Sequence, residues 1–187
     1  MSDLYLASDG DLRCIWAGGS PGELVYHDTE WGFPVREDKR LFEKVSLEGF
    51  QSGLSWRTIL DKRENFRAAF AGFDFHVVAE FTEDHVQRLL QDAGIVRHRG
   101  KIEAVINNAG RAVEQVETEG PLTDYFWSFQ PATDAEGQES AVAMAKDLKK
   151  RGWRFVGPTT AYAFIQAMGL INDHQAGCVV RERILAR

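Results

Sequence analysis

The spacing of apolar residues in the middle of the chain is that of α-helices, and it constrains the fold more than any other feature. From Asp38, which suits a helix N-cap, apolar side chains follow at Leu41, Phe42, Val45 and Phe50 with a helical period. The same spacing predicts helices at 86–93, closed by Gly94, at 102–116, and at about 140–150 and 160–169. Alternating β-branched segments joined by hairpin turns are missing, so the sequence predicts an all-α fold.

The composition is that of an ordinary soluble globular protein. The 187 residues carry 22 Lys and Arg against 28 Asp and Glu, a net charge of −6, and 44% are hydrophobic. These values exclude disordered, collagen-like and low-complexity classes. Two cysteines do not suit a secreted disulfide scaffold, and neither a signal peptide nor a membrane-spanning run is visible. We therefore expect a cytoplasmic protein with no membrane partner.

The two ends of the chain differ from its helical middle. Residues 1–35 contain a glycine-rich stretch among scattered aromatic and polar residues, and residues 170–187 follow the last predicted core helix. Between them, 36–169 forms the predicted helical body, in which the acidic loop 130–139 is the expected flexible insertion. No linker rich in Ser, Gly or Pro divides the chain, so we expect both ends to pack onto this body.

A basic turn between two predicted helices is the first candidate binding site. In the segment DAGIVRHRGKI, one helix ends at Gly94 and the next begins near Gly100, with Arg97, Arg99 and Lys101 around the turn. Unpaired backbone N–H groups and a helix N-terminus at one point favour a phosphate oxygen. The alternative is a common αα-turn whose basic tip is only solvated.

A second basic cluster, residues 146–154, contrasts with the acidic stretch 113–145. Because the charge is segregated, an acidic chain can still present a basic groove to a phosphate backbone. By itself this cluster is equally well explained as a solvated helix face.

Glu48 shares the apolar stripe of the first predicted helix. It follows Leu41 and Val45 at helical spacing, and a carboxylate there loses hydration unless it is paired or hydrogen-bonded. One interpretation is an acid in a pocket that binds a polar ligand. The other is a boundary Glu that caps the N–H groups of 49–53 or pairs with an arginine.

Aromatic residues gather around this acid in the sequence. Trp16, Tyr26, Trp31 and Trp56 lie in glycine-rich or polar surroundings. Most large aromatics are core residues, but several tryptophans at polar positions are less typical of a core. Flat walls beside a carboxylate suit a planar ligand that can stack, above all a cationic one.

The two cysteines are each accompanied by a histidine. His174 and Cys178 lie one helical turn apart, and Cys14 and His27 flank the glycine-rich stretch. The four form a complete tetrahedral set for Zn²⁺ with no open position, so the ion would be structural. Two buried free cysteines with unrelated histidines are the alternative.

The features above, and the order in which they follow one another along the chain, resemble the DNA-3-methyladenine glycosylase I family of base-excision repair. The resemblance spans most of residues 14–178. It is carried by YHDTEWGFP (26–34), LFEKVSLEGFQSGLSW (41–56), KRENFRAAF (62–70), LLQDAGIVRHRGKI (89–102), DYFWSF (124–129), LKKRGWRFVGPT (148–159) and LINDHQAGC (170–178).

The resemblance implies a helix-hairpin-helix glycosylase body at 36–169, with 1–35 and 170–187 clipped together by zinc. Cys14, His27, His174 and Cys178 match the zinc ligands of that family. The DNA-binding hairpin then occupies 94–100 and its border. The resemblance implies DNA contacts from two places. The turn that approaches the lesion contributes Gly53 and Leu54, and the hairpin contributes Gly94, Val96, Arg97, Arg99, Gly100 and Lys101.

The resemblance also implies a base pocket. Glu48 matches the catalytic carboxylate that contacts the excised base, Tyr26 a further base contact, and Trp56 the stacking wall. Trp16 and Trp31 match other pocket aromatics. Glu23 departs from the pattern, because an aromatic is expected there.

The implied activity is that of a monofunctional N-glycosyl hydrolase. It would flip 3-methyladenine out of alkylated double-stranded DNA, excise it and leave an abasic site, with free 3-methyladenine as product ligand and no need to form an oligomer. Two other classes are a DNA-binding module without turnover and a zinc hydrolase. The first would lack Glu48 or have a blocked pocket, and the second needs an open coordination site.

Overall fold

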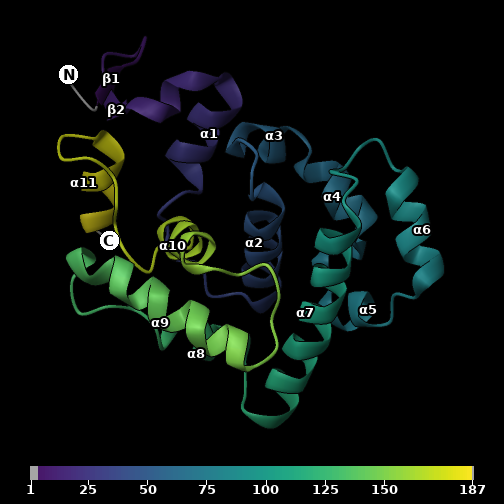
Figure 1. The fold of residues 1–187 in the computed structure, drawn as a ribbon. Helices are drawn as coiled ribbons and strands as arrows, with labels where there is room; N and C mark the ends of the chain where they lie inside the picture. The colour runs from purple at the N-terminus through teal and green to yellow at the C-terminus, as the bar shows by residue number, and fades with distance from the viewer. Residues whose placement is uncertain (1–3, 187) are drawn as a thin grey trace.

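The computed structural model describes residues 4–186, and helices make up most of that part of the chain (Figure 1). The α-helices are α1 (Pro21–Thr29), α2 (Asp38–Gln51), α3 (Trp56–Asp61), α4 (Arg63–Ala69), α5 (Phe75–Ala79), α6 (Glu83–Gln91), α7 (Arg99–Thr118), α8 (Leu122–Trp127), α9 (Gly137–Lys150), α10 (Pro158–Ala167) and α11 (Val179–Leu185). Short 3-10 helices are η1 (Ile15–Gly19), η2 (Ala71–Phe73) and η3 (Asp134–Glu136). The helical middle predicted from apolar spacing is confirmed.

Two short strands at the N-terminal end depart from the all-α prediction. β1 (Leu4–Leu6) and β2 (Leu12–Cys14) pair in an antiparallel register with Leu4 opposite Cys14. Gly10 takes φ +87° in the connecting loop, a conformation open to glycine at no steric cost. Strands of three residues are too short to show the alternation by which a strand is recognised in a sequence.

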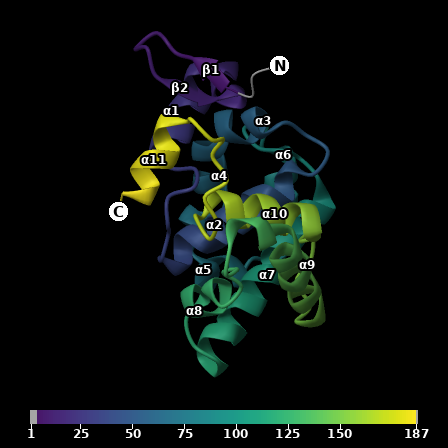
Figure 2. The ribbon, with the colours of Figure 1, turned by 90° about the vertical axis from the view of Figure 1, so that its left-hand side faces the viewer.

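α2 runs through the middle of the molecule and carries much of its core (Figures 1 and 2). Leu41, Phe42, Val45 and Phe50 are all buried, as their spacing predicted. Each such side chain contributes about 1.5–3 kcal/mol relative to exposure. Phe42 packs on a ring of α5 and Phe50 on a ring of α4, and the same apolar cluster continues into α10. α2 is therefore held firmly on several sides, which fixes the polar side chains it carries.

The sequence predicted Asp38 as the N-cap of α2, and this prediction is wrong. The N-cap residue is Glu37, and Asp38 is the first helical residue. Its carboxylate accepts hydrogen bonds from the backbone N–H groups of Leu122 at 3.0 Å and Thr123 at 2.7 Å. Asp38 thus satisfies the N-terminal donors of α8, a contact between distant parts of the chain that local sequence does not reveal.

The turn between α6 and α7 starts earlier than predicted. α6 ends at Gln91, and Gly94 lies beyond the helix, where its N–H donates to the Asp92 carboxylate at 2.7 Å. The N-cap of α7 is His98, whose ring accepts from the N–H of Lys101 at 3.2 Å. Side chains at both ends of the turn therefore shape it.

The acidic segment 130–139 has more structure than predicted. It contains η3, and α9 already begins at Gly137. The Asp134 carboxylate accepts the backbone N–H of Asn172 at 3.0 Å, which ties this segment to the C-terminal part of the chain.

The N-terminal β-hairpin and the C-terminal helix α11 lie side by side (Figure 2). Cys14 ends β2, and Cys178 is the N-cap residue of α11. Between residues 4 and 186, no helix combines the length and the apolar character needed to cross a membrane.

Candidate functional site

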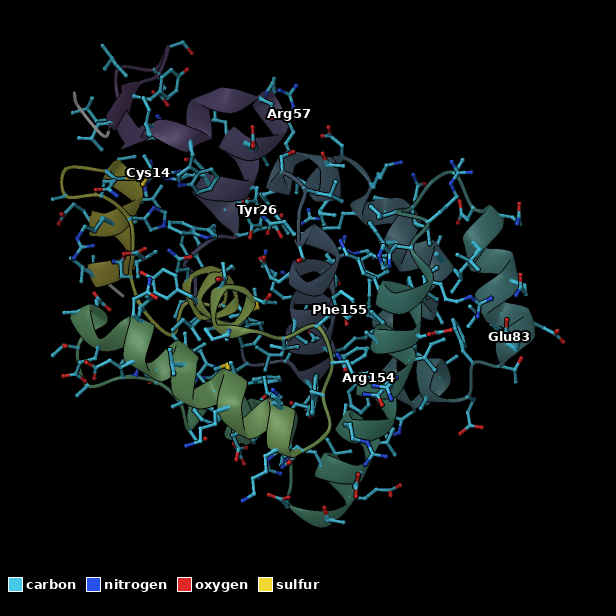
Figure 3. All side chains as sticks on the ribbon, viewed as in Figure 1. Cys14, Tyr26, Arg57, Glu83, Arg154 and Phe155 are labelled. Atoms are coloured by element: carbon cyan, nitrogen blue, oxygen red, sulfur yellow. The ribbon has the colours of Figure 1, made fainter. Side chains whose placement is uncertain are left out.

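A cavity of about 230 Å³ lies between α1, α2, α3 and α10. It brings together all five side chains that the sequence assigned to a base pocket. The complete lining is Trp16, Glu23, Tyr26, Trp31, Glu48, Gln51, Trp56, Ala163 and Gln166. Figure 3 shows Tyr26 in the middle of the molecule, between the end that carries Cys14 and the region around Phe155.

Aromatic rings form the walls of this cavity. Tyr26 and Trp56 have ring centroids 5.1 Å apart and planes tilted by 41°, and Trp16 stands edge-on to Trp31 at 5.1 Å. The indole N–H of Trp56 is buried and has no acceptor within residues 4–186. The cavity thus offers flat aromatic faces, which suit a planar heterocycle.

Glu48 lies on α2 with only 5% of its surface exposed. Its Oε1 pairs with Nζ of Lys44 at 2.7 Å, one helical turn earlier. The partner is a lysine and not the arginine considered from the sequence. Because Glu48 also lines the cavity, the ion pair does not remove it from the site.

Lys44 touches two further pocket residues. Its Nζ donates to the Tyr26 hydroxyl at 2.6 Å and lies 3.4 Å from the ring centroid of Trp56. Burial lowers the pKa of Lys44, an effect that Glu48 counteracts. Burial, with a further contribution from Glu48, raises the pKa of Tyr26 well above its usual value, so this phenol stays protonated.

Several residues that line the cavity or lie directly behind its wall were missed at the level of sequence. Lys44 and Gln51 had a signal, because they flank Glu48 at helical spacing on α2. Ala163 and Gln166 lie on α10, far away in sequence, and gave none. Glu23 was noticed only as a departure, and its half-buried carboxylate lies against Gly19 in the cavity wall.

The four predicted metal ligands converge at the joined ends of the chain. Cys14, His27, His174 and Cys178 are all buried, with their ligand atoms within 4.8 Å of one another. The His–His nitrogen distance is 3.1 Å, and three sulfur–nitrogen distances are 3.5, 3.7 and 3.7 Å. Zinc bond lengths imply edges of about 3.3 Å and about 3.6 Å in a tetrahedron, so this cluster fits such an ion.

Neighbouring groups orient the ligands toward one point. Asp28 accepts from Nδ1 of His27 at 2.8 Å, and the Trp31 carbonyl lies 3.0 Å from Nε2 of His174, which leaves the other ring nitrogen of each facing the cluster. Burial lowers the pKa of His27, and burial with the charge of His27 lowers that of His174 to about 4. A lowered pKa favours the neutral imidazole, which is the form that binds a metal ion. Burial raises the pKa of Cys14 to about 12, so a cation would have to displace its proton.

The cluster and the cavity share a wall. Trp16 stands edge-on to the ring of His27 at 5.1 Å, and Trp31 edge-on to that of His174 at 4.6 Å. Both tryptophans also line the cavity. A metal bound at the cluster would therefore hold two cavity walls in place.

The predicted DNA-binding residues fall on two neighbouring turns. In the α6–α7 turn, Gly94, Val96 and Gly100 are half-buried, Arg97 is exposed, and Arg99 pairs with Glu83 and Glu103. After α2, Gly53 takes φ +79° and Leu54 is 41% exposed. Only glycine adopts that backbone conformation without strain.

The prediction that Lys101 adds positive charge at the tip of the turn is wrong. Its side chain is buried, and Nζ donates to the carbonyls of Phe50 at 2.9 Å and Ser52 at 2.6 Å. These are carbonyls at the C-terminal end of α2, which have no partner within the helix. Lys101 therefore links the α6–α7 turn to the turn at Gly53.

The second basic cluster borders an open surface groove of about 690 Å³ between α7, α8 and α9. Arg151 in this groove pairs with Asp147 and Glu119, both at 2.6 Å. Acidic and basic groups thus alternate there beside Tyr125 and Phe129, and the lining of this groove contains none of the tryptophans that line the smaller cavity.

Comparison with known proteins gives a consistent set of relatives. The methyladenine glycosylase family model matches residues 16–182. The chain is 51% identical to DNA-3-methyladenine glycosylase 1 of Escherichia coli (strain K12), covering 89% of this chain and 95% of that protein. A crystal structure of 3-methyladenine DNA glycosylase I aligns with TM-score 0.85 at 45% identity, covering 89% and 98%. A crystal structure of a variant of another 3-methyladenine DNA glycosylase I, in complex with 3-methyladenine, aligns with TM-score 0.84 at 33% identity, covering 90% of this chain and 97% of that chain.

Proposed function

This chain belongs to the methyladenine glycosylase family, and on that premise we propose that its aromatic cavity is the pocket in which 3-methyladenine is excised from alkylated DNA. The reaction is hydrolysis of the N-glycosidic bond, which leaves an abasic site. The observation that carries this assignment is the buried Glu48 among Tyr26, Trp56 and two further tryptophans in one cavity. A volume of about 230 Å³ is suited to one extruded base.

Each wall of the cavity has a part in binding the base. Trp56 stacks on the extruded purine, and the carboxylate of Glu48 accepts a hydrogen bond from its polar edge. Tyr26 supplies a second polar contact, and Trp16 and Trp31 complete the walls. Stacking on an aromatic ring contributes about 1–3 kcal/mol per base, which helps to offset the cost of extrusion.

The chemistry needs little acid catalysis, because methylation at N3 leaves a positive charge on the base and the base departs neutral. The protein must bind the separating base and sugar better than the intact nucleotide. Glu48 acts on the base side of the bond. Water then attacks the cationic sugar.

The duplex is held by the two neighbouring turns. The α6–α7 turn forms a helix-hairpin-helix motif, in which backbone N–H groups at Val96 and Gly100 and the exposed Arg97 contact phosphates. Gly94, whose N–H is held by Asp92, shapes the turn. Gly53 and Leu54 approach the lesion, with the apolar Leu54 side chain placed to fill the space of the extruded base. Arg99 contributes once DNA phosphate competes with its two carboxylate partners.

The ion suited to the Cys and His cluster is structural zinc. When bound, it supplies a cross-link between the N-terminal segment 1–35 and the C-terminal segment 170–187, and its closed ligand shell leaves no position for substrate. Cys14 and His27 would hold it from one end of the chain, and His174 and Cys178 from the other.

One copy of the chain is sufficient for the activity, because a single chain supplies every residue lining the cavity. We therefore assign a monomer acting in the cytoplasm on double-stranded alkylated DNA, with free 3-methyladenine as the released product.

Release of free base from methylated duplex DNA tests this function. The unaltered protein should release 3-methyladenine and leave undamaged DNA intact. Glu48→Gln keeps the shape but removes the charge, and its single-turnover rate should fall about 10²-fold or more, as for loss of one charged hydrogen bond near the reacting centre. An unchanged rate would remove the carboxylate from the mechanism, and no release by the unaltered protein would refute the assignment.

A further inference from the structure

Lys44 is a buried cation in contact with three residues of the base pocket. Its ammonium donates to Glu48 at 2.7 Å and to Tyr26 at 2.6 Å, and it lies over the ring of Trp56 at 3.4 Å. Burying an ammonium is costly, and the contacts with Glu48 and the rings offset this cost. Their arrangement places one positive charge against Glu48, Tyr26 and Trp56, three of the proposed base contacts.

Lys44 lies behind the pocket wall and does not itself line the cavity. It borders a separate small void of about 20 Å³, which Tyr26 and Trp56 also border from their other side. The two rings therefore stand between the ammonium and a bound base. Lys44 acts on the base through the groups it holds.

The other charges around Lys44 already have partners. Glu30 binds Arg63 through two hydrogen bonds of 2.7 and 2.9 Å, and Glu43 binds Arg67 at 2.7 Å. Glu48 is the acidic partner of Lys44 in the described part of the chain. Glu48 is therefore the carboxylate that balances the charge of Lys44.

The direction of the hydrogen bonds follows from the chemistry of an ammonium group, which can only donate. The Tyr26 oxygen must accept from Lys44, so its own proton points elsewhere, and no acceptor for that proton is found within residues 4–186. Lys44 occupies Oε1 of Glu48, which leaves Oε2 as an acceptor for the base. Tyr26 and Glu48 together then present one donor and one acceptor in fixed places.

We propose that Lys44 is a specificity-determining positioning residue that fixes this donor–acceptor pair and thereby selects adenine over guanine lesions. The inference rests on the proposed function. The adenine edge offers an amino donor beside a ring-nitrogen acceptor, which matches Glu48 and Tyr26. Guanine offers an oxygen in place of the amino group, and this oxygen meets the carboxylate without a proton between them.

Removal of the ammonium frees both groups. The Tyr26 hydroxyl can then donate to Glu48 in place of the base, and a buried carboxylate that has lost its counter-ion tends to take up a proton. Either change removes the fixed pattern. Lys44→Met keeps the volume of the side-chain stem and removes the charge, so it isolates this effect.

The test measures 3-methyladenine and 3-methylguanine released from the same methylated duplex under single-turnover conditions. Their ratio is internally controlled, since loss of folded protein lowers both rates equally. For Lys44→Met we expect the ratio to fall about tenfold to about a hundredfold, the range for one lost bidentate base contact. Lys44→Arg retains charge and donors and should restore the ratio. The matched control is Lys39→Met, at an exposed position of the same helix.

Tyr26→Phe provides a second, independent variant. It removes the hydroxyl that Lys44 orients, so it should lower the ratio by itself, and adding Lys44→Met should then lower it much less than in the unaltered background. An unchanged ratio in an active Lys44→Met variant overturns the inference and leaves the proposed function standing. Absence of any base release by the unaltered protein overturns the proposed function, and the inference with it.

Discussion

The two carboxylates of the cavity have different surroundings. Glu48 is buried and paired with Lys44 at 2.7 Å, whereas Glu23 is half-buried and makes no side-chain hydrogen bond or ion pair within residues 4–186. Opposite charges in contact largely cancel at longer range. Glu23, which stands where the family resemblance leads one to expect an aromatic, therefore leaves the cavity with a net negative charge toward a cationic lesion.

We expect Glu23→Gln to slow the release of 3-methyladenine about three- to tenfold, because it removes this attraction from a position that water partly screens. The loss should shrink at high salt. The measurement is single-turnover base release at low and high ionic strength. Glu139→Gln, an equal change of charge at an exposed position away from the cavity, is the control. Equal losses in both variants would contradict a local role for Glu23.

Single elements of this fold serve two sites at once. Tyr26 and His27 are neighbours on α1, and because successive helical side chains point in different directions, one lines the cavity and the other faces the metal cluster. α2 likewise carries Glu48 into the cavity and ends at the turn that Lys101 supports. The cavity and the turn proposed to face DNA are therefore held by the same helix.

The segment after α9 holds a strained aromatic beside the α6–α7 turn. The Asn108 side chain holds the backbone of Arg154 with two hydrogen bonds. Its Nδ2 donates to the Arg154 carbonyl at 2.9 Å, and its Oδ1 accepts from the Arg154 N–H at 2.8 Å. The next residue, Phe155, has φ +55° and is 44% exposed, with its ring 6.2 Å from that of His98. Figure 3 shows Arg154 and Phe155 near α2 and α7. On the proposed function, we expect this exposed and strained aromatic to contact the bound DNA.

Phe155→Gly and Phe155→Ala separate the strain from the contact. Both lose the ring, so both should bind methylated duplex DNA several-fold more weakly. Only glycine relaxes at positive φ, and Phe155→Gly should be more stable than Phe155→Ala by about 1 kcal/mol. Urea unfolding and fluorescence titration with DNA give the two quantities. Full DNA affinity in both variants would refute the contact.

Across the whole molecule, the metal cluster joins the two ends of the chain and also supports the cavity. Cys14 and His27 come from one end and His174 and Cys178 from the other, and Trp16 packs against the ligand His27. Closing a loop of this length restricts the unfolded chain, so a bound ion adds stability. The same contacts transmit the order of the cluster to the cavity walls.

Removal of the proposed zinc ion by a chelator should therefore lower Tm and weaken the binding of free 3-methyladenine together. Thermal unfolding and quenching of tryptophan fluorescence by the base measure the two effects. In a Cys14→Ser variant, which lacks one ligand, the same chelator should change both far less. Full stability and full affinity of the metal-free protein would show that the cluster does not support the pocket.

Local sequence was sufficient for much of this protein. The apolar period of 38–50 and 102–116 predicted α2 and α7, because a helix needs only one continuous apolar stripe to be recognised. Residue type and spacing picked out Cys14, His27, His174 and Cys178 as a candidate ligand set, and the family resemblance favoured zinc over unrelated buried residues. The aromatic residues and Glu48 were also noticed as side chains unusual for their surroundings, and the resemblance gave them their expected roles in a base pocket.

Tertiary packing decided what those residues touch. Asp38 has the chemistry of a cap, but which helix it caps depends on where α8 packs. Lys101 has the charge of a phosphate ligand, but it lies against the end of α2 and donates to its carbonyls. In the sequence, Lys44 is not distinguished from other charged residues. Its role depends on α1 and α3, which place Tyr26 and Trp56 against it. Helical period is a local property of the chain, whereas the partner of a polar group is set by burial between elements distant in sequence, and this is why the first could be predicted and the second could not.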